Sequence, residues 1–237
     1  MLLKNTIDKL GDFCFDKRGL QFLPYIFVIL LEFKSFTEAK ECVPFEILCF
    51  AITFAGILIR ILTIAYVPEG TSGRNRGTQI AETLNTKGAY SVVRNPLYVG
   101  NFFIFLGITM MTQNITVIIF NSLLMLVIYS LIVLREENFL LNKFGEIYRN
   151  WCERVNCFIP SFKNFEKPER KFSLKKVIKN EHDTWLTTVA AFMGIEVLKG
   201  YFEVHTFFLI PIWTYIGIGT VVLWFISKRM KKAQLLN

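Results

Sequence analysis

The sequence predicts an all-α fold: a polytopic transmembrane helical protein with about six spans, a helical hairpin over residues 97–144 and a site at the cytoplasmic side. Hydrophobic residues make up 53% of the 237 residues, aromatic residues make up 15% with 24 Phe, and the mean hydropathy is +0.41. A soluble domain is less apolar and contains less Phe. We therefore expect one integral-membrane domain over residues 1–237.

Six apolar segments are candidates for the membrane spans. A span needs about twenty apolar residues, or somewhat fewer where the helix tilts or the bilayer thins. Four segments approach or reach this length: 44–67, 99–111, 115–134 and 207–226. Two weaker candidates are residues 20–33 and 185–198.

The positions of Lys and Arg predict the topology. If all six segments cross, one side of the membrane carries only Lys34, Lys40 and Lys199, and every other basic residue outside the spans lies on the opposite side. Basic residues accumulate on the cytoplasmic side. We therefore predict six crossings with both termini cytoplasmic. The net charge of +8 is then explained by the cytoplasmic surface and its anionic lipids rather than by nucleic acid.

Cysteine and histidine usage predicts neither a disulfide framework nor a metal site. The five Cys have no C-x-x-C spacing, and on the predicted topology only Cys42 lies outside. The two His, His182 and His205, have no partners at metal-ligand spacing.

The elements around the hairpin follow from local signals. Pro96 suits the first turn of a helix and places Asn95 at its N-cap. Gln113-Asn114 predicts a tight turn, and helical spacing then continues over 115–144, about 45 Å at 1.5 Å per residue. Gly145 predicts a C-terminal cap, a second helix is expected over 146–154, and the basic segment 161–184 is expected at the membrane interface.

The hairpin brings two polar motifs to the same depth. Arg94-Asn95 begins one helix, and Glu136-Glu137 lies where the other leaves the membrane. Such convergence predicts a site. A structural explanation of the first motif also remains open, in which Arg94 snorkels, Asn95 caps the helix and Tyr98 anchors at the headgroups.

The residues at this site suggest a ligand with positive charge and hydroxyl groups. The carboxylates of Glu136 and Glu137 suit the positive charge. Neighbouring aromatic side chains can stack on a base or face a cation. These aromatic residues are Tyr90, Tyr98, Tyr148 and Trp151. S-adenosylmethionine has these features, although the residues alone do not select it over other nucleotides. A Rossmann fingerprint is missing from the sequence.

Two separated motifs resemble those of a known family. The stretch V-R-N-P-L-Y-V-G is followed after the hairpin by R-E-E-N-F-L-L-N-K-F-G-E-I-Y-R-N-W and then by F-I-P. This pattern resembles the isoprenylcysteine carboxyl methyltransferase and phospholipid methyltransferase superfamily, over about residues 88–160. The loop 70–92 is similar to that of bacterial members, including those that methylate a lipid A phosphate.

The resemblance implies an integral-membrane enzyme that uses S-adenosyl-L-methionine to methylate a membrane lipid or lipidated acceptor, in a bacterial inner membrane. It implies a catalytic core over 68–160, with N-terminal spans in 1–67 and a basic interfacial segment and C-terminal spans in 161–237. The implied catalytic residues are Arg94, Asn95, Glu137 and Arg154. The implied cofactor-binding residues are Tyr90, Arg94, Asn95, Pro96, Tyr98, Gly100, Glu136, Glu137 and Tyr148, and the implied substrate-binding residues are Arg74 and Arg76.

Asn95 departs from the family, which commonly has His at this position. Asn can donate a hydrogen bond but cannot titrate near pH 7, so it cannot act as a base. An anionic acceptor needs no base, and the interpretation therefore favours a carboxylate or phosphate oxygen. Isoprenylcysteine, a phospholipid amine and a lipid A phosphate all remain open as acceptors.

Two other function classes remain. A membrane reductase of the sterol-reductase type would bind NADPH at a similar helical core, although such enzymes usually have more spans. A transporter or scaffold subunit would not be an enzyme, but a transport path should place several polar groups near the midplane of the spans. Whether the protein binds S-adenosylhomocysteine, NADPH or neither distinguishes the methyltransferase, the reductase and the non-enzymatic class.

Overall fold

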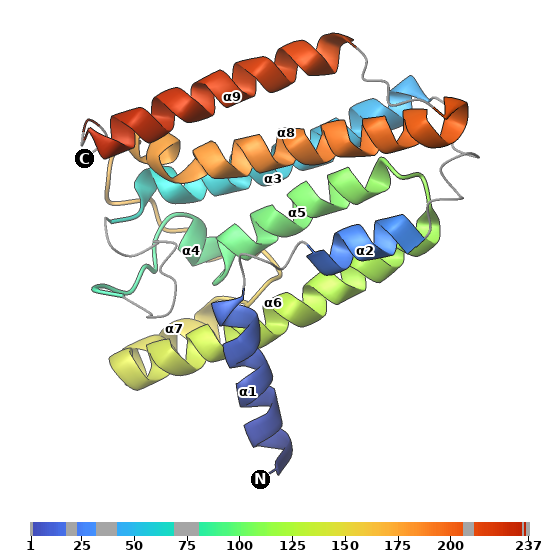
Figure 1. Cartoon of the computed structure of the whole chain (residues 1–237). Coiled ribbons are helices and arrows are strands. Elements are labelled where there is room, and N and C mark those ends of the chain that lie inside the picture. The colour runs from blue at the N-terminus through green and yellow to red at the C-terminus, as the bar shows by residue number, and fades with distance from the viewer. Residues whose placement is uncertain are drawn as a thin grey trace.

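The computed structural model describes residues 2–17, 23–31, 42–68, 81–205, 211–233 and 235, and within these the regular structure is helical, as predicted. Figure 1 shows the arrangement. The helices are α1 (Leu2–Asp16), α2 (Leu23–Leu31), α3 (Val43–Tyr66), α4 (Ala89–Val92), α5 (Pro96–Met110), α6 (Ile115–Phe144), α7 (Glu146–Arg154), α8 (Leu174–Val204) and α9 (Pro211–Lys232).

The long helices alternate in direction across the bundle. Helices α3, α6 and α9 run one way, and α5 and α8 run the other (Figure 1). In space the order is α9, α8, α3, α5 and α6, and each packs on the next. The carboxyl ends of α3 and α6 therefore meet the amino ends of α5 and α8 at one end of the bundle, beside α4 and α7.

Glycine sets the distance between α3 and α5. A Cβ atom on Gly56 would lie 2.5 Å from the carbonyl oxygen of Gly100, and a Cβ atom on Gly107 would lie 2.5 Å from the carbonyl oxygen of Cys49. Contacts this short with backbone atoms are not tolerated. Small residues thus let the two helix backbones approach closely, as is common between membrane helices.

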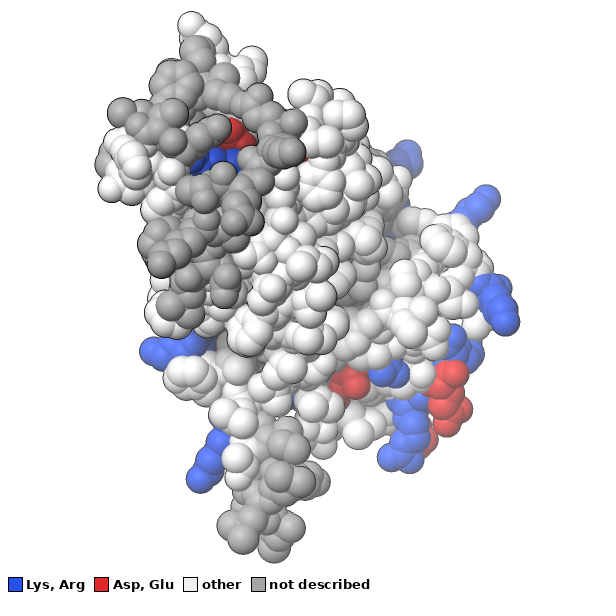
Figure 2. All heavy atoms as spheres, turned by 90° about the vertical axis from the view of Figure 1, so that its right-hand side faces the viewer, with Lys and Arg blue, Asp and Glu red and all other residues white. Residues whose placement is uncertain are grey.

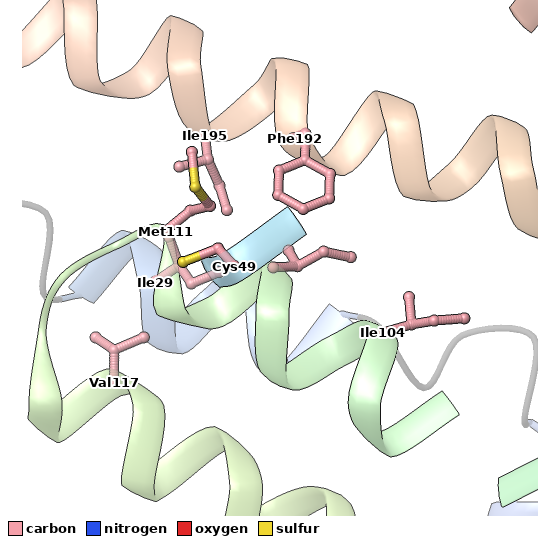
Figure 3. Packing of buried hydrophobic residues seen from close by; sticks show 8 residues of the cluster. Ile29, Cys49, Ile104, Met111, Val117, Phe192 and Ile195 are labelled. Carbon is pink, nitrogen blue, oxygen red and sulfur yellow. The ribbon is translucent and has the colours of Figure 1, made fainter. Parts of the chain in front are cut away.

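A hydrophobic cluster joins the helices at the far end from the carboxyl terminus of α6. Figure 3 shows Phe192 and Ile195 of α8 pointing toward Cys49 of α3 and Met111 at the end of α5. The ring of Phe192 also stacks on Trp213 of α9, with 5.9 Å between centroids. These contacts tie α8 and α9 to the rest of the bundle.

The outward faces of the helices are apolar. The most apolar windows of α3 and α6 are only 33% buried, whereas the core helix of a water-soluble protein is mostly buried. Among the described residues these two helices are long and apolar enough to cross a membrane, and α5 is a shorter apolar helix. Figure 2 views the end of the bundle where α5 turns into α6 and shows mostly uncharged residues, with charged side chains toward the edges.

The predicted bounds of the hairpin elements are confirmed. Helix α6 spans Ile115–Phe144, α7 spans Glu146–Arg154, and Gly145 between them has a φ of +54°. The side chain of Asn114 accepts hydrogen bonds from the backbone at the start of α6. The six crossings stay a prediction, and the expected segments 20–33 and 207–226 lie partly outside the described residues.

One expectation was wrong in detail. Asn95 does occupy the N-cap of α5, with Pro96 in the first turn, but its side chain does not cap the helix. Arg60, inside the predicted span 44–67, is buried and paired with Glu181. The basic segment 161–184 includes the start of α8 from Leu174 onward, where Glu181 is fully buried, and its expected place at the membrane interface stays a prediction.

Candidate functional site

The start of α5 and the end of α6 meet through two charge-assisted contacts. One guanidinium nitrogen of Arg94 lies 3.1 Å from Oε1 of Glu137. The Tyr98 hydroxyl donates to Oε1 of Glu136 at 3.0 Å. Hydrogen bonds to a carboxylate are stronger than those between neutral groups. The predicted convergence of the two motifs is therefore confirmed, and Arg94 is not only a lipid anchor.

Arg94 is also tied to the chain that follows α7. Its Nη1 donates to the carbonyl oxygen of Cys152 at 3.2 Å, and its backbone nitrogen donates to the carbonyl oxygen of Asn156 at 2.8 Å. Only 15% of its side chain is exposed. Partners on both sides of the guanidinium fix its plane against Glu137.

Cys157 was not predicted and lies in the middle of the site. Nδ2 of Asn95 donates to the Cys157 carbonyl oxygen at 3.3 Å and lies 3.4 Å from its sulfur. The thiol in turn donates to Oε1 of Glu137 at 3.6 Å. Burial, and then the charge of Glu137, raise the pKa of the Cys157 thiol. The thiol therefore stays protonated and serves as a donor.

Aromatic side chains form one wall of the site. Tyr148 and Trp151 of α7 are buried with their ring centroids 5.6 Å apart, and Tyr90 of α4 packs against them. Burial and then the nearby Glu137 raise the pKa of Tyr148, and burial and then Glu136 raise the pKa of Tyr90. Both phenols are neutral at physiological pH and lie within electrostatic range of the carboxylate pair.

Two donors of the site are buried without a partner among the described residues. They are Nε of Arg94 and Nε1 of Trp151. A buried donor without an acceptor costs about 1–3 kcal/mol, so native structures rarely keep one without a reason. A bound ligand with acceptor atoms would satisfy both groups.

The segment after α7 is hydrogen-bonded to the residues that precede Arg94 in the chain. The backbone nitrogen of Ser161 donates to the Val92 carbonyl oxygen at 2.9 Å, and that of Gly88 donates to the Glu166 carbonyl oxygen at 2.9 Å. Gly88 has a φ of +63°, which favours glycine. These bonds fix α4, and with it Tyr90, beside the site.

Gly100 and Arg154 make their described contacts elsewhere. Gly100 lies against α3, where a Cβ atom would meet Cγ of Arg60 at 2.6 Å. Arg154 is exposed, and its Nε donates to the Asn150 carbonyl oxygen of its own helix. The predicted substrate-binding residues Arg74 and Arg76 lie outside the described residues. The roles of these residues in binding remain predictions.

A second polar network, which was not predicted, lies beside this site. Nε and Nη2 of Arg60 donate to the two carboxylate oxygens of Glu181 at 2.8 and 2.6 Å, and Nη1 donates to Oδ1 of Asn101 at 2.6 Å. The sequence signal for this network was an arginine inside a predicted span. The spacing of residues along the sequence could not identify its partner.

Comparison with known proteins matches the central region to one family. Residues 47–147, from α3 to the start of α7, match the family described as phospholipid methyltransferase. This match supports the resemblance to the isoprenylcysteine carboxyl methyltransferase and phospholipid methyltransferase superfamily. The match includes Arg94, Tyr98 and both glutamates, but not Cys157 or the helices α8 and α9.

Curated relatives match the chain in part. A protein-S-isoprenylcysteine O-methyltransferase of Schizosaccharomyces pombe is 35% identical over 142 residues, 54% of this chain and 59% of that protein. The cobalt-zinc-cadmium resistance protein CzcN of Cupriavidus metallidurans is 35% identical over 33% of this chain and 36% of its own length. The nickel-cobalt-cadmium resistance protein NccN of Alcaligenes xylosoxydans xylosoxydans is 33% identical over 35% of this chain and 38% of its own length.

The chain thus spans between about a third and three fifths of the length of these relatives. No solved structure matches the chain.

Proposed function

We propose that this protein is a membrane methyltransferase that uses S-adenosyl-L-methionine to methylate a membrane lipid or a lipidated acceptor. The observation that carries the proposal is the pair of contacts Arg94–Glu137 and Tyr98–Glu136 at the end of an apolar helical hairpin. Both contacts lie inside the region that matches the methyltransferase family.

The residues present fit this cofactor. Two adjacent carboxylates favour a positively charged ligand, and 24% of the Glu137 side chain remains exposed. The unpartnered donors on Arg94 and Trp151 suit the carboxylate or ring nitrogens of a nucleoside-linked amino acid. The rings of Tyr90 and Tyr148 suit a base or a sulfonium. When bound, S-adenosylmethionine supplies a methyl group on a positively charged sulfur.

The chain supplies alignment and electrostatics rather than proton transfer. Arg94 and Tyr98 hold the two glutamates in fixed positions, so their charge does not have to reorganise during reaction. The buried rings of Tyr148 and Trp151 exclude water from one side. Positioning of this kind favours a direct displacement between two bound reactants.

The acceptor is proposed to be an anionic oxygen, a carboxylate or a phosphate. The acceptor oxygen forms the new bond to carbon, and the electrons of the carbon–sulfur bond return to sulfur, so no proton has to move. This suits a site in which Asn95 cannot titrate and the pKa values of Cys157 and Tyr148 are raised. Arg74, Arg76 and Arg154 are the proposed groups for holding the acceptor.

We also propose six crossings of a bacterial inner membrane, with both termini and the site on the cytoplasmic side. Support comes from the alternation of the long helices, which brings the amino end of α5 and the carboxyl end of α6 together (Figure 1). The basic residues of α7, of residues 163–171 and of the end of α9 occur on segments at this same end.

Binding of S-adenosylhomocysteine to the purified protein in lipid, measured by calorimetry, tests the function. We expect saturable binding that Glu137→Gln weakens about 10- to 100-fold, because a hydrogen bond to a charged group contributes about 1.5–3 kcal/mol. Glu153→Gln, at an exposed position of α7, is the matched control and should bind like the unmodified protein. Folded protein that binds NADPH but not S-adenosylhomocysteine would refute the proposal in favour of a reductase.

A further inference from the structure

A buried ion pair joins three helices next to the site. Arg60 of α3 is 7% exposed and Glu181 of α8 is 0% exposed. The guanidinium binds the carboxylate through two nitrogens and donates with the third to Asn101 of α5. Figure 1 shows α3 between α5 and α8, so the network crosses the centre of the bundle.

The network contacts the second turn of α5. The side chain of Arg60 lies against Gly100, where a Cβ atom would be 2.6 Å from Cγ of the arginine. Asn101 follows Tyr98 by three residues, so both lie on neighbouring positions of one helix. A shift of the Arg60 guanidinium would therefore move the helix that carries Tyr98 and begins two residues after Arg94.

Tyr90 connects the network to the carboxylate pair. The charges of Glu136 and of Arg60 act on this phenol in opposite directions, after burial, which raises its pKa. Tyr90 therefore lies within electrostatic range of both groups. The ion pair is thus near the proposed cofactor site and not only in the membrane-spanning core.

We infer that Glu181 is a positioning residue for the proposed cofactor site: it orients Arg60, which through Asn101 and Gly100 sets the placement of α5 and hence of Arg94 and Tyr98. The inference rests on the proposed function. Since α8 lies outside the residues that match the methyltransferase family, the C-terminal part of this chain supplies a support for the site that the matched region does not contain.

Stability alone is a weak explanation for this ion pair. Desolvation of two charges offsets most of their attraction, and apolar residues of similar volume are often as stabilising or more so. Removing one partner, in contrast, leaves a buried charge and costs several kcal/mol. A variant that removes both charges therefore separates positioning from stability.

The experiment measures S-adenosylhomocysteine affinity and thermal midpoint for two variants in lipid. Asn101→Leu keeps the ion pair and removes its link to α5. Arg60→Met/Glu181→Leu removes the pair and keeps its volume. We expect both to unfold within a few degrees of the unmodified protein and to bind S-adenosylhomocysteine at least tenfold more weakly. Glu196→Gln is the control, because Glu196 lies on the same helix and pairs with Lys199 at 3.9 Å.

The outcomes are distinguishable. If the unmodified protein binds and both folded variants bind equally well, the inference is wrong and the proposed function stands. If only the control variant retains full affinity, the inference is supported. If the folded, unmodified protein does not bind at all, the proposed function fails and the inference fails with it.

Discussion

Substitution of Gly56 by Ala tests the packing that places α3 against the site helix. The new Cβ atom would lie 2.5 Å from the Gly100 carbonyl oxygen and 2.7 Å from the backbone nitrogen of Ile104. An ordinary contact begins near 3.4 Å, so the helices must separate by about 0.9 Å. Overpacking of this kind costs about 1–3 kcal/mol, against a gain of up to about 1 kcal/mol from helix propensity.

Gly219→Ala on α9 is the matched control, because nothing lies within 4 Å of a Cβ atom there. It should be neutral or stabilising by up to about 1 kcal/mol. We expect a difference of about 2 kcal/mol between the two variants, or roughly 4–8 °C in thermal midpoint for a chain of this size. The assay is thermal unfolding of both variants in the same lipid nanodiscs. A midpoint for Gly56→Ala at or above that of Gly219→Ala would refute the close-packing argument.

Three further predictions concern the site. Tyr98→Phe removes the bond to the Glu136 carboxylate and should weaken S-adenosylhomocysteine binding about 10- to 100-fold in calorimetry, since a hydrogen bond to a charged group contributes about 1.5–3 kcal/mol; an unchanged affinity would contradict this. Because burial raises its pKa, the Cys157 thiol should react with iodoacetamide at pH 8 more slowly than a free cysteine of ordinary pKa, and the difference in rate should narrow as the pH rises. Trp151→Phe removes a donor without a described partner. It should leave the thermal midpoint within a few degrees but weaken ligand binding, and a large loss of stability without a loss of affinity would argue against a ligand contact.

Local signals were sufficient to predict the hairpin. Helix ends are marked by Asn114 before an apolar run, by Gly145 after it and by Pro96 in the first turn of the preceding helix. Each of these residues satisfies or removes a particular backbone hydrogen-bonding group. Helix rise then places Glu136 and Glu137 opposite Arg94. That the two motifs meet followed from this geometry, and it is the part of the candidate site that the sequence by itself determined. The individual contacts, Arg94 with Glu137 and Tyr98 with Glu136, came from the structure.

The partners across the bundle were decided only by the tertiary structure. Glu181 meets Arg60 across 121 residues, and Cys157 meets Asn95 across 62, and no periodicity encodes either pairing. Arg60 lies near the end of its helix, and acceptors on α8 and α5 hold its side chain inside the bundle. Which faces of two helices meet depends on where small residues such as Gly56 allow close approach. Side-chain pairing follows from that packing, because a buried charge is retained where the packed neighbours supply its partner.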